Sequence, residues 1–368
     1  MDKKDLATWF ESLSKEEKEV VKLRFGIDGE EPLTLKEISL KLGIEISKAK
    51  LIEVKYIQKL RDLTDKSESN QTEASIKNSE KISDFASLKD LIESNYAEME
   101  SLSLGNTLGG IPVHLYDFDA MTQGLRRGDL IAFAGRPMMG KTSLALQFAR
   151  NIARQNLKVC FFSFDMSKQE LAHRIMAMET GFGINRVRTG RLQTEEWIAI
   201  NKERDSLGKL PLFIDDKKDI SIEEIKTKCR NISNSNEKDC LGLIVIECCQ
   251  MMGYLNHLDY KDKQEIILKE LKILAKELNV PVVITLPVSP KVEERKNSRP
   301  MLSDIKESEA LENYVDIIAM VYREEYYEPE TEDRGIAELI LTTHRNGPVG
   351  TVKMLFEPQY GRYRNLAA

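Results

Sequence analysis

The stretch that decides the fold is Gly135-Arg136-Pro137-Met138-Met139-Gly140-Lys141-Thr142. It matches G-x-x-x-x-G-K-[ST], directly after the apolar run DLIAFAG and directly before SLALQFARNIARQ, which has the pattern of a helix. In a strand-loop-helix unit, amides of such a loop bind phosphate, the lysine reaches the β- and γ-phosphates, and the hydroxyl binds Mg²⁺. The alternative is a glycine turn with a chance lysine. We expect a nucleotide and Mg²⁺ site that includes residues 135–142 and Ser143, with Thr142 as a metal ligand.

Two acidic residues follow strand-like runs further along the chain. Glu247 ends LGLIVIE, and Asp165 follows VCFFSF. Because ligands bind at the carboxyl ends of the strands of an open parallel sheet, we expect both to be catalytic. Glu247 would hold the metal, and Asp165 would orient the attacking water. The alternatives are that Glu247 is only a charge at a strand end, and that Asp165 is the N-cap of the helix MSKQELAHRIMAM, a role it could combine with the first.

Strands and helices alternate from about residue 105 to 368. The runs DLIAFAG, VCFFSFD, LFIDD, LGLIVIE, VPVVITL and DIIAMVYR are almost continuously apolar, and helical segments lie between most of them. This pattern predicts an α/β domain with a mostly parallel central sheet covered on both faces. AELILTTHR and TVKMLFEP follow each other without a helix, so we expect them to end the domain as an antiparallel hairpin with its turn at Asn346-Gly347-Pro348.

Residues 1–63 are predicted to form a small all-α domain of their own. Two helices with apolar inward faces come first. Thr34 is the expected N-cap of LKEISLKLGI, with Glu37 at the capping-box position, and this helix ends near Gly43. A further helix is expected over about residues 47–63. Two short helices joined by a glycine-containing turn predict a helix-turn-helix.

Two segments connect this domain to the α/β domain. Residues 64–84 contain no aromatic residue and almost nothing apolar, which predicts a polar linker. Residues 85–104 place apolar residues along one helical face but are too short to form a core. This linker helix must therefore dock on something, and another subunit is one candidate.

Composition restricts the class of protein. The formal net charge is −6, so any contact with nucleic acid must come from a local patch. No apolar run approaches the ~20 residues that span a bilayer, and MDKKDLATWF lacks the apolar core of a secretory signal. The five cysteines contain no CxxC pair, which argues against zinc or a disulfide framework. We expect a cytoplasmic protein with free thiols and no membrane partner.

Several long stretches carry a resemblance to a known family. They include residues 124–153 (GLRRGDLIAFAGRPMMGKTSLALQFARNIA), 161–177 (FFSFDMSKQELAHRIMA), 241–252 (LGLIVIECCQMM) and 334–358 (RGIAELILTTHRNGPVGTVKMLFEP). Together, over about residues 86–366, they resemble the C-terminal RecA-like motor of DnaB-type replicative helicases. The resemblance implies a RecA-like P-loop NTPase fold, ATP between the subunits of a ring that is usually a hexamer, single-stranded DNA in the channel, and 5′-to-3′ translocation. It also implies that residues 85–104 pack on the neighbouring subunit.

Some residues depart from the family pattern at positions that act on ATP. The family's catalytic glutamate is Asp165 here, and its metal-binding aspartate is Glu247. A phosphate-sensing glutamine is replaced by Pro287, and a lysine two residues before the finger arginine by Thr343. The finger arginine itself is retained as Arg345, which the resemblance makes a catalytic residue acting on a neighbouring subunit's ATP.

The expected DNA-binding loop is altered as well. Glu309 stands where the family has a glycine whose size and free amide suit a phosphate, so it should repel DNA. Cations nevertheless exceed acids by five to three over residues 291–306. The candidate DNA-binding residues are Arg295, Lys296, Arg299 and Lys306. The alternative is that this run is a solvated face.

The N-terminal domain resembles region 4 of bacterial sigma factors through LSKEEKEVVKLRFGI, TLKEISLKLGI and SKAKLIEVKYIQKLR. In that family the recognition helix is rich in arginine, whereas this chain has Ile46, Lys48, Lys50 and Leu51 there. Lysine lacks the planar fork that reads guanine, and residues 1–63 carry no net charge. Two roles stay open: a weak DNA contact, or docking of a transcription or replication protein.

Two functions follow. The first is an ATP-hydrolysing DnaB-type DNA helicase that moves along single-stranded DNA, with weakened hydrolysis. The second is a catalytically degenerate paralogue that binds ATP and assembles either with copies of itself or in a mixed ring with an authentic helicase. It would act as a regulatory or assembly partner of a helicase or of the transcription machinery. A sigma-like transcription factor with an ATP-sensing body is a weaker third, since the reading helix lacks arginines.

Overall fold

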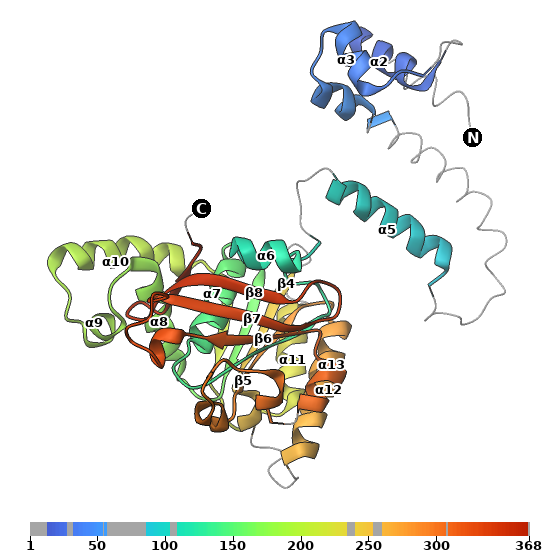
Figure 1. The fold of residues 1–368 in the computed structure, drawn as a ribbon. Helices are drawn as coiled ribbons and strands as arrows, with labels where there is room; N and C mark the ends of the chain where they lie inside the picture. The colour runs from blue at the N-terminus through green and yellow to red at the C-terminus, as the bar shows by residue number, and fades with distance from the viewer. Residues whose placement is uncertain are drawn as a thin grey trace. The chain divides into compact units, whose positions relative to one another are not determined.

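The computed structural model describes residues 13–27, 32–53, 55–56, 86–103, 109–233, 240–252, 260–306 and 308–366 (Figure 1). The chain divides into two compact units, Met1–Ser94 and Asn95–Ala368. The division falls inside helix α5 (Leu88–Ser103). The predicted polar linker, residues 64–84, and most of the first predicted helix lie outside the described residues.

The first unit contains α2 (Lys15–Phe25), α3 (Leu35–Leu42) and a helical stretch over residues 46–53. The predicted capping box of α3 is present: Thr34 accepts a hydrogen bond from the Glu37 amide, and the Glu37 carboxylate accepts one from the Thr34 amide at 2.8 Å. Gly43 ends α3 in the left-handed conformation (φ 66°), which glycine adopts without strain. The unit has its own core, formed by Val20, Val21, Leu23, Ile38, Ala49, Ile52 and Tyr56.

The second unit is built on one nine-stranded sheet in the order β3-β2-β4-β5-β1-β6-β7-β8-β9. The strands from β3 to β6 in this order pair in parallel, and β7, β8 and β9 are added antiparallel. The predicted parallel sheet and the antiparallel pairing of β7 with β8 are therefore confirmed. Their bounds are β1 (Leu130–Gly135), β2 (Lys158–Ser163), β3 (Leu212–Asp215), β4 (Leu241–Glu247), β5 (Val282–Pro287), β6 (Ile317–Tyr322), β7 (Ile336–His344), β8 (Gly350–Glu357) and β9 (Arg362–Arg364).

Strand β9 corrects the prediction that a hairpin ends the domain. It pairs antiparallel with β8, and Phe356 opposes Tyr363. Its three residues are too few to show an alternating pattern, and two of them are arginines. The strand forms because Tyr363 is buried against Phe356, with ring centroids 4.5 Å apart.

Both faces of the sheet are covered, as expected for a parallel sheet. Along β1, Ile131 and Phe133 join one hydrophobic cluster, while Leu130, Ala132 and Ala134 join the other. The helices on the first face include α6 (Tyr116–Thr122), α7 (Lys141–Ala153) and α8 (Lys168–Thr180), followed along the chain by α9 (Ile184–Thr189) and α10 (Thr194–Leu207). Those on the second are α11 (Ile222–Ser233), α12 (Tyr260–Glu277) and α13 (Ser308–Tyr314).

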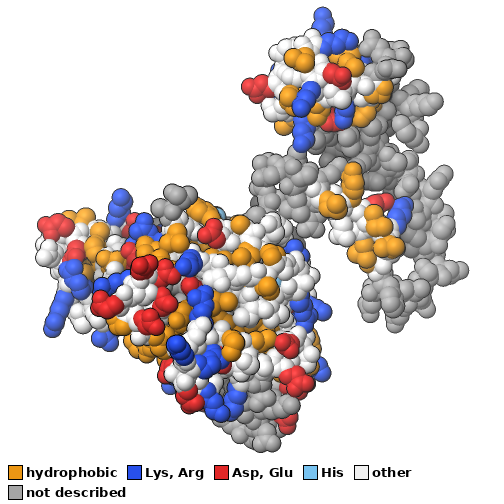
Figure 2. All heavy atoms as spheres, in the orientation of Figure 1, with side chains coloured by type: hydrophobic (Ala, Val, Ile, Leu, Met, Phe, Trp, Pro, Cys, Tyr) orange, Lys and Arg blue, Asp and Glu red, His pale blue; other side chains and the backbone are white. Residues whose placement is uncertain are grey.

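Helix α5 exposes large apolar side chains, some of which are visible as orange spheres in Figure 2. They are Leu88, Leu91, Ile92, Tyr96 and Met99. Among the described residues, no helix combines the length and the apolar character needed to cross a membrane.

Candidate nucleotide site

The predicted phosphate loop joins β1 to α7, as the motif requires. Gly140 is the N-cap of α7 with φ 101°, a conformation that favours glycine. A residue of β9 also supports the loop, because the Tyr363 hydroxyl donates to the Gly140 carbonyl at 3.1 Å. A Cβ on Gly140 would lie 2.3 Å from that hydroxyl oxygen, so even alanine would displace the support.

Lys141 begins α7 and folds back over the loop. Its Nζ donates to the carbonyls of Gly135 at 2.8 Å and Arg136 at 2.9 Å. Burial lowers the pKa of the Lys141 ammonium to about 8, although the nearby Glu247 charge acts in the opposite direction. A cation held in this way at the N-terminus of α7 is suited to bind phosphate oxygens.

The two predicted metal residues meet at the edge of the sheet. Glu247 ends β4, is fully buried, and accepts a hydrogen bond from the Thr142 hydroxyl. Its second oxygen accepts one from the Ser163 hydroxyl at 2.5 Å. Burial raises the pKa of Glu247, and the two hydroxyl donors lower it in part. Hydroxyl and carboxylate oxygens are the donors that Mg²⁺ prefers, so Thr142 and Glu247 fit the expected ion.

Ser163 was missed by the sequence prediction. It ends β2 opposite Glu247 in the parallel register, which places the two side chains on neighbouring strands at the same level. The sequence alone does not give the register of β2 against β4, and Ser163 and Glu247 are far apart in sequence, so their contact could not be predicted.

Asp165 lies at the rim of the same cavity with an exposed side chain. The alternative that it caps the following helix is wrong. Ser167 is the N-cap of α8, accepting from the Glu170 amide, while the Glu170 carboxylate accepts from the Ser167 amide at 3.0 Å. Two residues separate Asp165 from α8, so its carboxylate is not used by the helix.

The cavity above the loop has a volume of about 730 Å³, within the range that holds small ligands. Of the nine predicted nucleotide-binding residues, Pro137, Met138, Gly140, Lys141, Thr142 and Ser143 line it. Two others turn their side chains elsewhere: Arg136 pairs with Glu293 at 2.8 Å, and Met139 is buried in the core. Gly135, the ninth, contributes the carbonyl that holds Lys141.

The cavity is also lined by residues that the motif does not predict, among them Arg174 from α8, Cys248 after β4, and Arg323 after β6. Arg323 is nearly buried, donates to the Met138 carbonyl at 3.2 Å, and lies over the Phe356 ring. It therefore joins the end of β6 to the phosphate loop. Pro287, which replaces the family glutamine, also lines the cavity.

The four candidate DNA-binding residues fall into two groups. Arg295 makes two hydrogen bonds of 2.9 and 2.8 Å to the Asp304 carboxylate and a third to the Arg299 carbonyl, so it braces its own loop. Arg299 pairs with Glu338 and lies over the Tyr322 ring. Lys296 and Lys306 have exposed side chains.

Arg345 lies at the opposite end of the sheet from its own phosphate loop. Its amide donates to the Asp316 carbonyl at 2.9 Å, and the Asp316 amide donates to the carbonyl of Leu130, the first residue of β1. Gly135 is five residues further along β1, about 17 Å at the usual rise of a strand. The Arg345 guanidinium donates to the carbonyls of Glu312 and Asn313 and is 3.5 Å from the Asp316 carboxylate.

Comparison with known proteins identifies the second unit. Residues 110–365 match the family model for the DnaB-like helicase C terminal domain, and residues 9–62 match the model for Sigma-70, region 4. Among solved structures, one described as an ATPase domain aligns with TM-score 0.73 at 31% identity, covering 77% of this chain and 100% of that one. A DnaB-like replicative helicase, described with its interactions with primase, aligns with TM-score 0.71 at 26% identity over 91% of this chain and 88% of that one.

Curated relatives agree. The replicative DNA helicase DnaB of Geobacillus stearothermophilus is 38% identical over 77% of this chain, and the replicative DNA helicase DnaC of Bacillus subtilis is 36% identical over 82%. These matches span 62% and 66% of the relatives' own lengths. The family model covers most of the chain, and the sheet and phosphate loop agree with it. The chain therefore belongs to the DnaB-like helicase C-terminal domain family.

Proposed function

We propose that the chain is an ATP-binding subunit of a DnaB-type helicase ring that translocates 5′-to-3′ on single-stranded DNA, with weakened hydrolysis. The observation that carries the proposal is that Lys141 and Thr142 line one cavity of nucleotide size, while the buried Glu247 is hydrogen-bonded to Thr142. The relatives that match it are replicative helicases. By this proposal the chain is an enzyme, an ATP hydrolase.

Each residue has a defined task in nucleotide binding. The loop amides and the α7 N-terminus bind the phosphates, and Lys141 exchanges its two loop carbonyls for phosphate oxygens. Thr142 and Glu247 would hold Mg²⁺, which neutralises charge on the phosphates when bound. Asp165, exposed at the cavity rim, is the group that would orient the attacking water.

Slow hydrolysis is expected because of side-chain length. A P-loop site normally uses an aspartate at the Glu247 position, which leaves room for a metal-bound water. The longer Glu247 reaches the Thr142 hydroxyl directly, and Asp165 is one methylene shorter than the glutamate of the family pattern. Pro287 and Thr343 supply neither an amide nor a cation. Displacing a catalytic group by about 1 Å can cost about 10²-fold in rate, so several such changes can remove most turnover.

Assembly into a ring, hexameric or mixed with an authentic helicase, is part of the proposal. Arg345 is too far from its own phosphate loop to act there, which supports a role on a neighbour's nucleotide. The apolar face of α5 offers a surface for a neighbouring subunit. Lys296 and Lys306 are exposed cations of the proposed DNA-binding loop, and Glu309 weakens this loop.

The second candidate is the degenerate paralogue, which binds ATP without significant turnover. The direct contact between Thr142 and Glu247 favours it. In this case the N-terminal unit provides the contact to a transcription or replication protein. Its Lys48 pairs with Glu16 at 2.6 Å and its Leu51 is exposed, a surface better suited to a protein than to DNA phosphates.

Steady-state ATPase of the full chain, with and without single-stranded DNA, separates the two candidates. The reversion Asp165→Glu, Glu247→Asp, Pro287→Gln and Thr343→Lys should raise the rate with little change in nucleotide affinity, because these groups act mainly in the transition state. Glu309→Gly added to it should increase stimulation by DNA. Brisk, DNA-stimulated turnover of the unmodified chain would show an ordinary helicase, whereas an inactive reverted chain would reject weakened hydrolysis as the explanation.

Nucleotide binding is tested separately. A fluorescent ATP analogue is titrated into the full chain and into Lys141→Ala, with Lys209→Ala, at an exposed position outside the cavity, as the control. We expect only Lys141→Ala to weaken binding. Equal affinities for all three proteins would reject the assignment of the site.

A further inference from the structure

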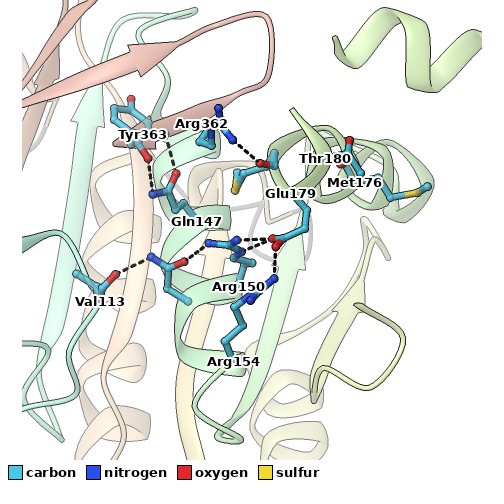
Figure 3. A network of polar contacts seen from close by, with 11 residues as sticks. Val113, Gln147, Arg150, Arg154, Met176, Glu179, Thr180, Arg362 and Tyr363 are labelled. Carbon is cyan, nitrogen blue, oxygen red and sulfur yellow. Dashed lines mark hydrogen bonds and ion pairs between the residues drawn. The ribbon is translucent and has the colours of Figure 1, made fainter. Parts of the chain in front are cut away.

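A second cavity, of about 540 Å³, lies between α7, the segment before α6, and β9 (Figure 3). Four arginines line it: Arg150, Arg154, Arg362 and Arg364. We call it the arginine pocket. It is distinct from the nucleotide site, because Arg154 follows the last residue of α7 and Lys141 is the first, about 20 Å apart along the helix axis.

Positive charge exceeds negative charge in the arginine pocket. Two carboxylates pair with its arginines: Glu179 with Arg150 and Arg154, and Glu357 with Arg362 and, at 4.0 Å, with Arg364. Neither glutamate is among the residues that line the cavity, and no other acidic residue of the described chain is. Four guanidinium groups against two carboxylates leave two positive charges uncompensated.

Two of the four arginines, Arg154 and Arg364, are additional to the ion pairs that Arg150 and Arg362 already form with Glu179 and Glu357. Arg150 already binds Glu179 through both Nε, at 2.8 Å, and Nη2, and also donates to Asn151 at 2.7 Å. Arg362 binds Glu357 at 2.8 Å and reaches the Met178 carbonyl. Arg154 and Arg364 are added to these complete pairs, and their side chains are 40% and 59% exposed. Their remaining N–H groups are available to a ligand.

The frame of the pocket is rigid. Gln147 exchanges two hydrogen bonds with the backbone of Tyr363, and Asn151 donates to the Val113 carbonyl at 2.7 Å. Asn365 accepts from the Tyr116 amide at 2.8 Å and donates to the His114 carbonyl. These contacts, some drawn in Figure 3, fix the backbone on which the arginines stand. Burial lowers the pKa of Arg150, and the neighbouring Arg154 and Arg362 charges lower it further.

We propose that the arginine pocket binds phosphate groups of an anionic ligand, with Arg154 and Arg364 as the direct contacts. Arginine presents a planar fork that matches phosphate oxygens, and two such forks line one cavity. Among the described residues that line it there is little apolar surface, because Leu115 is the single aliphatic one and Tyr363 is buried. The pocket is therefore suited to a phosphate chain rather than to a base. The source is either a free polyphosphate compound or the backbone of single-stranded DNA.

The test uses the full chain carrying Lys141→Ala, which suppresses binding at the nucleotide site. Inorganic tripolyphosphate and an oligonucleotide of twenty thymidines are titrated calorimetrically, at one fixed low ionic strength, into this protein and two derivatives. One carries Arg154→Gln and Arg364→Gln, which leave the Arg150–Glu179 and Arg362–Glu357 pairs intact. The matched control carries Arg188→Gln and Arg204→Gln, which remove the same charge from exposed positions outside the pocket.

We expect the pocket derivative to lose at least about tenfold in tripolyphosphate affinity, because charge-assisted hydrogen bonds are removed, while the control is unchanged. An effect on tripolyphosphate alone identifies a free phosphate compound as the source; an effect of similar size on the oligonucleotide identifies nucleic acid. No binding by the parent, equal affinities in all three proteins, or an equal loss in the control would overturn the proposal. Unfolding curves of the three proteins establish that each is folded.

Discussion

The nucleotide site contains two ionisable groups of opposite sign, the partly buried Lys141 and the fully buried Glu247. Burial disfavours both charges, lowering the pKa of Lys141 to about 8 and raising that of Glu247. A bound phosphate would restore the Lys141 charge, and a bound cation would restore that of Glu247. The charged forms of Lys141 and Glu247 are therefore favoured most when phosphate and cation are both bound.

Nucleotide affinity should depend on pH through Lys141. In the free protein the ammonium loses its proton above about pH 8, so binding there requires a proton to be taken up. The dissociation constant of a fluorescent ATP analogue should be constant below that pH and rise by up to about tenfold per pH unit above it. Lys141→Arg stays protonated in this range and should show a flat profile. A flat profile for the unmodified chain would contradict the prediction.

Stability should depend on pH through Glu247. Its raised pKa means that the folded state holds the proton more tightly than the unfolded state, so folding is favoured at low pH and loses stability as pH rises from the usual glutamate value through the folded one. Glu247→Gln should therefore unfold at higher urea concentration than the unmodified chain at neutral pH, with a difference that shrinks as pH falls towards the usual glutamate value. Glu338→Gln, which breaks the pair with Arg299, should instead lower stability at neutral pH.

At the scale of elements, the turn between β2 and α8 separates two tasks. Ser163 and Ser167 serve the structure: the first binds Glu247 and accepts from the Met166 amide at 3.0 Å, and the second caps α8. Asp165 lies between them and is used by neither. The turn therefore presents one carboxylate to the cavity from a backbone held at both ends.

Stability and catalysis should separate along this turn. Ser167→Ala removes the α8 N-cap and should lower the free energy of unfolding by about 1 kcal/mol, with ATP hydrolysis changed little. Asp165→Asn should leave stability within about 0.5 kcal/mol and lower the hydrolysis rate. Urea unfolding and steady-state ATPase of the two variants check this. A stability loss for Asp165→Asn as large as that for Ser167→Ala would show that Asp165 has a structural role.

At the scale of the whole molecule, the position of Arg345 predicts that active sites form between chains. In the chain with all four reversions, Lys141→Ala and Arg345→Ala should each be inactive alone. Mixed oligomers should recover part of the ATPase, because one chain supplies Lys141 and its neighbour supplies Arg345. Mixing Lys141→Ala with the double variant is the control and should recover nothing. Failure of the first mixture, with mixed oligomers verified by native mass spectrometry, would place Arg345 outside the reaction.

The two units should also be separable. The first has its own core, and the phosphate loop, Glu247 and α5 are all contained in residues 85–368. We expect this shortened chain to keep the oligomer size of the full chain by light scattering, and its affinity for ATP. Ile92→Glu on the exposed face of α5 should reduce the oligomer size in both chain lengths. A shift of residues 85–368 to monomers would show that the N-terminal helices build the assembly.

Local sequence determined the parts of this protein that depend on local physics. The phosphate loop, the apolar strands and the α3 capping box each arise from residues within a few positions of one another. Pairing of Thr142 with Glu247 was also predictable, because parallel strands bring their carboxyl ends to one edge. The β7–β8 hairpin followed from two strands without an intervening helix.

Only the tertiary structure decided the contacts made across long sequence separations. Strand β9 exists because Tyr363 finds a buried place beneath the phosphate loop, not because its own residues favour a strand. Ser163 contacts Glu247 because the register of β2 and β4 places them side by side. Arg295 pairs with Asp304 because the loop that carries both folds back on itself. The arginine pocket draws on α7 and β9, more than two hundred residues apart in places. The periodicity of a sequence does not identify the ion-pair partner of a charged side chain. Its role is therefore determined only when the fold brings that partner within reach.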